Sequence, residues 1–173
     1  MSVERCDECG FVYESLETGE IGSTIRGLAQ QVASELVRPA VSGSIGTRPA
    51  PEIWSALEYG CHVRDVLLVQ RERVLLALVE ERPSFARMYR DERVSLAGYA
   101  GERPSDVADH LTLAADLFGR VIDGLTPEQL ARTGIYNFPA PMDRDVAWLG
   151  RHTAHEATHH LGDVRSVLAG VEP

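Results

Sequence analysis

Residues 143–169 read DRDVAWLGRHTAHEATHHLGDVRSVLA, and this stretch decides the fold. Its apolar side chains recur every three or four positions, which is the spacing of a helix that buries one face. Such a helix is stable only when its apolar face packs against other elements. We therefore predict a helix from about residue 143 to about residue 169 within a bundle. Its apolar face consists of Val146, Leu149, Ala157, Val164, Val167 and Leu168.

Three earlier segments share this periodicity. The first begins at residue 21 and stops before Pro39, the second covers 52–80, and the third runs from Pro104 to residue 125. We find no convincing pair of strands. Four amphipathic helices with connections of this length predict an all-α fold, a four-helix bundle, and bundles build metal sites from side chains on facing helices.

The connecting segments carry signals for turns and loops. Thr126 and Gln129 form a capping-box pattern around Pro127, which predicts a short helix. The remaining connections are rich in Gly, Pro, Ser or Arg, which predicts two loops and, between them, an excursion over the surface. They are residues 41–51, 84–103 and 133–142.

Length and composition indicate one soluble globular domain. The chain has 173 residues, of which 44% are hydrophobic and 25% charged. We predict a single domain over residues 1–173, in which residues 1–17 form a short N-terminal extension. The net charge of −9 argues against a nucleic-acid partner, because phosphate binding requires a basic face. No apolar run reaches the ~18 residues of a membrane span, so we expect a cytoplasmic protein.

The second predicted helix places ionisable side chains on an apolar face. His62, Asp65 and Glu72 fall within a stripe of Leu, Val and Cys residues. Burying such groups is costly unless they are paired or bind a metal. A single His in this position is more often a hydrogen-bonded core residue than a metal ligand, so both interpretations stay open for this helix alone.

The last helix offers two pairs of metal ligands. His155 with His159, or Glu156 with His160, would place two ligands four positions apart on one helical face. At ~100° per residue, Glu156 and His160 lie at the edge of the apolar face, whereas the other pair points nearly the opposite way. A site closed by His62 lies where helices meet. We therefore predict His62, Glu156 and His160 as the metal ligands, and keep the other pair as the alternative.

A repeated pattern, His-x-x-Asp-Val, begins at His62 and again at His160. An Asp three positions after a His can hold the ring nitrogen of that His, or of a neighbouring ligand, that faces away from the metal, and so fix the tautomer. We predict this supporting catalytic role for Asp65 and Asp163, the alternative being ordinary solvated helix charges. Asp65 and Glu72 are also candidate bases, should the metal activate water.

The three cysteines do not indicate a disulfide framework. Cys6-x-x-Cys9 is half of a zinc knuckle, and no second half follows at the usual spacing. Three interpretations stay open: a small structural metal site completed by groups elsewhere, a redox pair, or an exposed turn. Cys61 points about 100° away from the adjacent His62 on a helix, so we expect it to pack as a small apolar residue.

At these residues the chain resembles the DinB/YfiT-like superfamily, which includes mycothiol-dependent maleylpyruvate isomerase and bacillithiol transferases. The resemblance extends from residues 54–62, WSALEYGCH, to the end of the last helix. It implies a four-helix bundle with one metal-binding His on the second helix and two ligands, four apart, on the last. Glu156 and residues 160–163, HLGD, match that form. The family pattern does not account for the N-terminal cysteines.

The resemblance implies a metal-dependent thiol S-transferase that uses a low-molecular-weight thiol on an electrophilic small molecule. The metal, zinc or another divalent ion such as Ni²⁺, would hold the thiol as a thiolate. All 17 basic residues are Arg, which is typical of high-G+C bacteria, where the thiol would be mycothiol. The alternatives are a metal-dependent hydrolase and a non-catalytic metal-binding stress-response protein. Proteins of the latter kind are often dimeric, so a homodimer is a candidate assembly for this chain.

Overall fold

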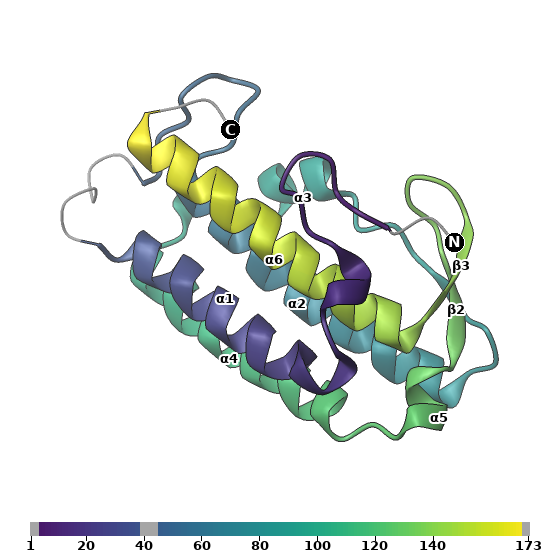
Figure 1. Ribbon diagram of the computed structural model, residues 1–173. Helices are drawn as coiled ribbons and strands as arrows, with labels where there is room; N and C mark the ends of the chain where they lie inside the picture. Colours follow the sequence, from purple (N-terminus) through teal and green to yellow (C-terminus); the bar gives the residue numbers. More distant parts are fainter. Residues whose placement is uncertain (1–3, 39–44, 171–173) are drawn as a thin grey trace.

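In a computed structural model, residues 4–38 and 45–170 are described, and they fold around four long helices (Figure 1). These are α1 (Ile21–Leu36), α2 (Ala56–Val79), α4 (Pro104–Asp123) and α6 (Val146–Ala169). The predicted bundle is confirmed, although residues 1–3 of the extension and 41–44 of the first loop lie outside the described part. The shorter helical elements are η1 (Tyr13–Ser15), η2 (Thr18–Glu20), α3 (Arg90–Leu96), η4 (Tyr99–Gly101) and α5 (Pro127–Leu130).

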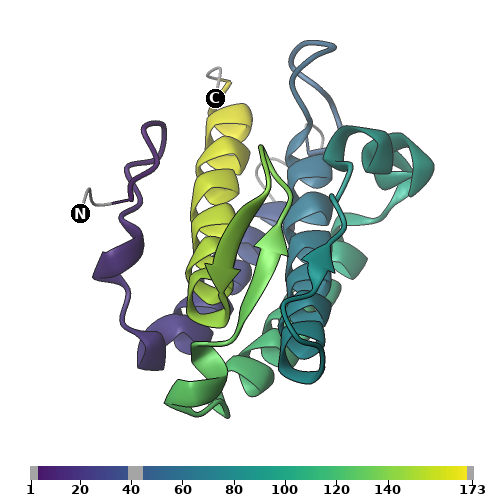
Figure 2. The ribbon, with the colours of Figure 1, turned by 90° about the vertical axis from the view of Figure 1, so that its right-hand side faces the viewer.

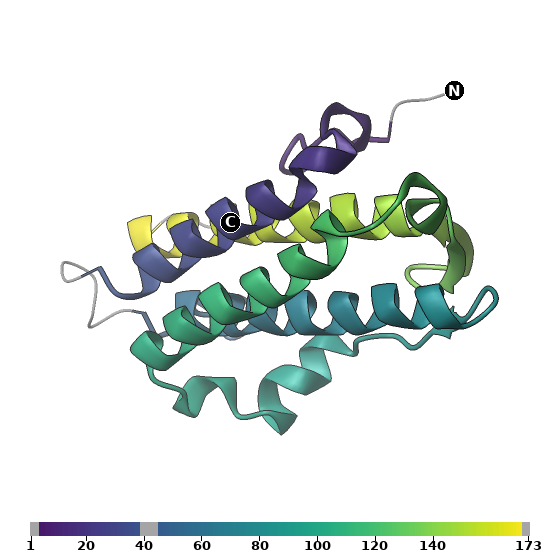
Figure 3. The same ribbon diagram turned by 90° about the horizontal axis from the view of Figure 1, so that it is seen from below.

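The four long helices run side by side along the length of the molecule (Figure 3). Both α1 and α2 pack against α4 and α6, and they lie roughly across the bundle from each other. The contact between α2 and α6 positions the site, because these two helices carry the buried ionisable residues. None of the helices in the described part of the chain is both long and apolar enough to cross a bilayer.

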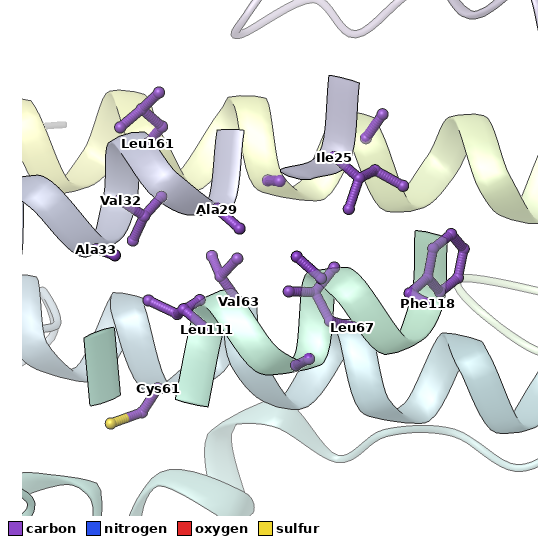
Figure 4. Packing of buried hydrophobic residues seen from close by; sticks show 14 of the residues in the cluster. Ile25, Ala29, Val32, Ala33, Cys61, Val63, Leu67, Leu111, Phe118 and Leu161 are labelled. Carbon is purple, nitrogen blue, oxygen red and sulfur yellow. The ribbon is translucent and has the colours of Figure 1, made fainter. Parts of the chain in front are cut away.

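The core is built from aliphatic and aromatic side chains of all four long helices (Figure 4). Ile25, Leu67 and Phe118 are at most 1% exposed, and Leu161 of α6 packs in the same cluster. Burial of one such side chain contributes about 1.5–3 kcal/mol. Cys61 is fully buried among them, so the prediction that it packs as a small apolar residue is confirmed.

Two helices begin later than predicted because a side chain caps each of them. Before α2, the backbone N–H of Glu58 donates to Ser55 Oγ, and Glu58 Oε2 accepts from the Ser55 backbone. This capping box moves the start from residue 52 to residue 56. Before α6, Asp145 Oδ1 accepts from the backbone N–H of Trp148 at 2.6 Å, so the helix begins at residue 146 instead of 143.

The prediction of a loop over 133–142 and of no strand pair is wrong. These residues form most of a hairpin, whose first strand also pairs in parallel with a two-residue strand. Gly134 lies against the ring of Phe85, where a Cβ atom would be 2.4 Å from a ring carbon. Strands this short contain too few residues for the alternation of apolar and polar side chains to be recognised in the sequence. The strands are β1 (Ser84–Phe85), β2 (Thr133–Tyr136) and β3 (Met142–Asp145).

The segment 84–103, predicted to be a surface excursion, is partly buried. Phe85 is 2% exposed and Tyr99 is fully buried. The Tyr99 hydroxyl donates to Asp65 of α2 at 2.7 Å, which ties the segment to the bundle. It therefore forms a second layer over α2 and one wall of the site described below.

The N-terminal residues 4–13 fold back on themselves in a turn that we call the N-terminal knuckle. Arg5 and Val12 form an antiparallel bridge, and the backbone N–H of Gly10 donates to the carbonyl of Cys6 at 3.0 Å. Gly10 has a φ of +73°, a conformation that other residues rarely adopt. The knuckle lies along α6, on the side away from α2 (Figure 2). It can therefore contact α6 residues that do not face the bundle.

Candidate metal centre

One His of α2 and two residues of α6 converge between these helices. His62 Nε2 lies 3.9 Å from Glu156 Oε2, and His160 Nε2 lies 3.7 Å from the same oxygen. The two imidazole rings have centroids 4.8 Å apart and are nearly perpendicular, at 84°. We call His62, Glu156 and His160 the inner cluster. Among the described residues, it is one of the groups whose ligand atoms lie close enough together to bind a metal.

His62 is buried without a hydrogen-bond partner. Its side chain is 2% exposed, and neither ring nitrogen bonds to any described residue. Burial and the neighbouring His160 lower the pKa of His62 to about 3, so the ring is neutral at pH 7 and presents a lone pair. An unpaired buried polar group costs about 1–3 kcal/mol and is rare in native proteins. A metal ion held with Glu156 and His160 would satisfy His62 Nε2.

His160 is held from behind by Asp163. Its Nδ1–H donates to Asp163 Oδ2 at 2.7 Å, which leaves Nε2 facing the inner cluster. Burial opposes the charged ring, but Asp163 and Glu156 outweigh it and raise the pKa of His160 to about 9. Burial likewise opposes ionisation of Glu156, yet the neighbouring imidazoles of His155 and His160 hold the carboxyl pKa well below its usual value. Without metal, His160 and Glu156 therefore form an ion pair.

The donor set suits a divalent metal with an exchangeable position. Two imidazoles and one carboxylate form the ligand set of several catalytic zinc sites, which leave a fourth position to water or substrate. Ligand atoms around a tetrahedral zinc with bonds of ~2.1 Å lie about 3.4 Å apart. The separations of 3.7 and 3.9 Å to Glu156 are close to this value. The residues of the inner cluster therefore fit such an ion.

The predicted contact between Asp65 and His62 is wrong. Asp65 accepts instead from the Tyr99 hydroxyl at 2.7 Å and from Arg64 Nε at 2.9 Å. The segment after α2 folds back and supplies Tyr99, a contact that the helical spacing does not reveal. The second candidate base, Glu72, has a side chain 68% exposed and paired with the preceding Arg. Asp65 and Glu72 are therefore engaged away from the inner cluster.

A cavity of about 330 Å³ opens beside the inner cluster, with His62 and Glu156 in its wall. Arg73 also lines it and is only 9% exposed. Its guanidinium lies 5.0 Å from the centroid of the Tyr136 ring. No carboxylate of the described residues pairs with Arg73 within 4.0 Å, which leaves a buried positive charge for a ligand. The other polar or charged residues in the wall include Gln70, Arg87, Arg90, Asp91, Glu92 and His152.

His152 and Arg73 are the site residues that sequence reasoning missed. Hydrogen bonds join His152 Nδ1 to the Tyr13 hydroxyl at 2.8 Å and Nε2 to the Tyr136 hydroxyl at 3.0 Å. Burial lowers the pKa of His152 to about 4, so the ring is neutral at pH 7. Its place in the His-rich helix was visible, but both tyrosines come from other elements. Arg73 carried no signal at all among the many arginines of the chain.

The alternative ligand pair does not join the inner cluster. His155 and His159 face the N-terminal knuckle, where their rings lie near Cys6 and Cys9. The helical-wheel argument therefore placed the two pairs on the correct sides of the helix. His62 is grouped only with Glu156 and His160 among the described residues that could share a metal.

Residues 28–164 match the sequence model of the DinB superfamily. The chain belongs to this superfamily. The resemblance noted from its motifs is thereby confirmed. All three residues of the inner cluster lie within the part of this DinB-superfamily chain that matches the model. No curated protein matches the chain.

One solved structure with the same fold is YfiT from Bacillus subtilis. It has a TM-score of 0.70 and 17% sequence identity, over 84% of this chain and 85% of YfiT. YfiT is described as a probable metal-dependent hydrolase with an unusual four-helix bundle topology. At this identity the likeness establishes a shared DinB-type fold.

Proposed function

We propose that this DinB-superfamily protein is a metal-dependent thiol S-transferase. The observation that carries the proposal is the inner cluster at the wall of a cavity, where both ring nitrogens of the buried His62 have no partner. Three protein ligands leave a coordination position for a substrate. The metal is zinc or another divalent ion such as Ni²⁺, and the thiol is a low-molecular-weight one such as mycothiol.

A divalent metal at this position would lower the pKa of the bound thiol, so that the sulfur is a nucleophilic thiolate at neutral pH. The sulfur forms a bond to the electrophilic carbon, the leaving group departs with its electron pair, and the thiol proton goes to solvent. His62 presents a neutral nitrogen, His160 would release its proton when the metal binds, and Asp163 keeps the His160 ring in position. The tyrosine-held His152 keeps the adjacent cavity wall in a fixed geometry.

Arg73 suggests the charge of the electrophile. It is buried in the cavity wall and has no acidic partner among the described residues. Its contacts with the Ala86 carbonyl and Gln70 hold the guanidinium in place. A carboxylate on the substrate would pair with it and orient the reacting carbon toward the inner cluster. We therefore propose a small anionic electrophile.

A metal-dependent hydrolase is the second candidate, favoured by the description of YfiT. Activation of water requires a base near the metal. Asp65 and Glu72 are engaged elsewhere, so His152, whose Nε2 lies 3.7 Å from Glu156, would have to serve. The thiol route needs no protein base, because coordination itself favours the thiolate. A non-catalytic metal-binding protein would not need the cavity.

The test is turnover of a panel of carboxylate-bearing electrophiles by the zinc-loaded protein, with and without mycothiol. We expect consumption of thiol and electrophile in equal amounts, and loss of at least 100-fold in kcat/KM for His62→Ala. His110→Ala is the matched control, since His110 is exposed on α4 and should keep full activity. Product formed without thiol would favour the hydrolase, and no turnover with metal bound would contradict both enzymes.

A further inference from the structure

A second group of metal ligands lies on a neighbouring face of α6, beside the inner cluster. Cys6 and Cys9 of the N-terminal knuckle meet His155 and His159, and one ligand atom of each lies within 4.8 Å of all the others. We call these four residues the outer cluster. The knuckle is far from α6 in the sequence, which explains why the cysteine pair had no recognisable second half.

His155 is oriented so that one nitrogen faces the cysteines. Its Nδ1 lies 3.1 Å from the Tyr13 hydroxyl and 3.4 Å from Glu156 Oε1. Its Nε2 is buried and has no hydrogen-bond partner. A ligand His normally has its second nitrogen held in this way by a hydroxyl, carboxylate or carbonyl.

His159 shows the same arrangement with the two nitrogens exchanged. Its Nε2 lies 3.4 Å from Glu8 Oε2 and 3.8 Å from Asp163 Oδ2. Its Nδ1 is buried without a partner. Two adjacent imidazoles therefore each have one buried nitrogen without a hydrogen bond, and one ligand atom of each ring lies within 4.8 Å of the cysteine sulfurs. A cation bound between these four groups would satisfy the buried nitrogens.

The knuckle holds both sulfurs in one tight turn. The backbone N–H of Cys6 donates to the carbonyl of Phe11 at 2.9 Å, which brings the two ends of the turn together. Gly10, with its positive φ, closes the turn by its hydrogen bond to the Cys6 carbonyl. A metal ion binds the thiolate form of cysteine and favours its formation. Neither thiol is in a disulfide.

We propose that the outer cluster binds a second divalent metal, zinc by its donor chemistry, in a four-ligand structural site. Two thiolates and two imidazoles are a tetrahedral zinc set that leaves no position for substrate. Zinc–sulfur and zinc–nitrogen bonds of ~2.3 and ~2.1 Å place the ligand atoms about 3.4–3.8 Å apart. The outer cluster needs only small side-chain adjustments to reach this geometry. This proposal does not depend on the thiol-transfer proposal.

The role of the outer metal is to fasten the knuckle to α6. Without it, the attachment consists mainly of Tyr13, which is 7% exposed, and of Glu4, whose carboxylate accepts from Trp148 Nε1 at 3.1 Å. Tyr13 in turn bonds to His152 in the wall of the cavity. Metal at the outer cluster therefore positions Tyr13, which holds His152 in the cavity wall beside the inner cluster.

The test loads the full chain with Co²⁺ under reducing conditions and measures metal content and absorption. We expect one equivalent for each cluster and a thiolate-to-cobalt charge-transfer band. Cys6→Ser with Cys9→Ser should remove the band and one equivalent, and His155→Ala with His159→Ala should do the same. His62→Ala should keep the band while losing the inner equivalent. Cys61→Ala is the matched cysteine control and should keep both.

Several results would overturn the proposal. A wild-type protein without the band, or a band that survives either double substitution, would show that these four residues do not bind the metal together. A reduced protein whose two thiols titrate freely in the presence of excess metal would favour the redox pair. Amide exchange provides a second readout: residues 5–16 should exchange slowly with zinc and rapidly in the cysteine double variant, whereas α4 should be unchanged.

Discussion

The two faces of α6 carry two ligand pairs that differ by a single residue in register. Glu156 and His160 turn toward α2, where His62 completes a three-donor set. His155 and His159 turn toward the N-terminal knuckle, where two cysteines complete a four-donor set. One residue corresponds to ~100° around a helix, so a single segment can serve two separate sites.

The donor sets explain why the two sites differ in kind. The inner cluster offers no thiolate, has three protein donors, and places His62 and Glu156 in the wall of a cavity, which suits a site where a substrate binds. The outer cluster offers two sulfurs from a tight turn and has no position left over. Two acids lie near His residues of both sites: Glu156 is near His155, His62 and His160, and Asp163 is near His159 and His160. The comparison therefore predicts two sites that bind separate metals and are both positioned by α6.

The largest expected effect is on the free energy of unfolding, which should depend on zinc bound at the outer cluster. Cys6→Ser with Cys9→Ser should lower the free energy of unfolding by about 3–4 kcal/mol when free zinc is 100- to 1,000-fold above the dissociation constant of the outer site. Denaturant unfolding at fixed free zinc measures this difference. It should vanish when a chelator removes the metal from both proteins. A difference that persists in chelator would mean that the serines disturb the fold directly.

The next effect concerns the support of His160. Asp163→Asn should weaken zinc binding at the inner cluster 10- to 100-fold, because the amide holds the ring less firmly than a carboxylate. The measurement is competition with a chromogenic chelator at pH 9, in the cysteine double variant so that only the inner site is counted. Equal affinities for the two proteins would show that Asp163 is an ordinary surface charge.

The pH dependence of zinc binding should also identify the inner cluster. The pKa of His160 is raised to about 9, so zinc must displace its proton at lower pH, whereas His62 and Glu156, with lowered pKa values, do not compete at neutral pH. Affinity should therefore rise about tenfold per pH unit from pH 6.5 and level off near pH 9. Calorimetry in buffers of different ionisation enthalpy counts the released proton. A flat profile would contradict this account.

The smallest expected effect tests the stability of α6, the helix that carries ligands of both sites. Asp145→Ala removes the N-cap of α6 and should cost about 1 kcal/mol of stability. The cap lies before both ligand pairs, so metal content should stay that of the unaltered protein. Thermal unfolding together with metal analysis provides the measurement. Loss of either metal would mean that the first turn of α6 positions the ligands as well as stabilising the helix.

The sequence by itself determined the bundle, because four long apolar series at helical spacing have few other ways to bury their faces. It also separated the two pairs of α6, since the angle between neighbouring helical residues is fixed. It missed the capped helix starts and the hairpin, where single hydrogen bonds and strands of two to four residues decide the outcome.

Only the tertiary structure decided which residues of other elements lie opposite each ligand pair of α6. Asp65 turned to Tyr99, and Arg73 entered the cavity wall, through contacts between elements that no local spacing records. Cys6 and Cys9 found their partners about 150 positions away in the chain, because packing of the N-terminal knuckle on α6 sets that distance. Periodicity describes the faces of a helix, and packing alone selects the residues opposite them.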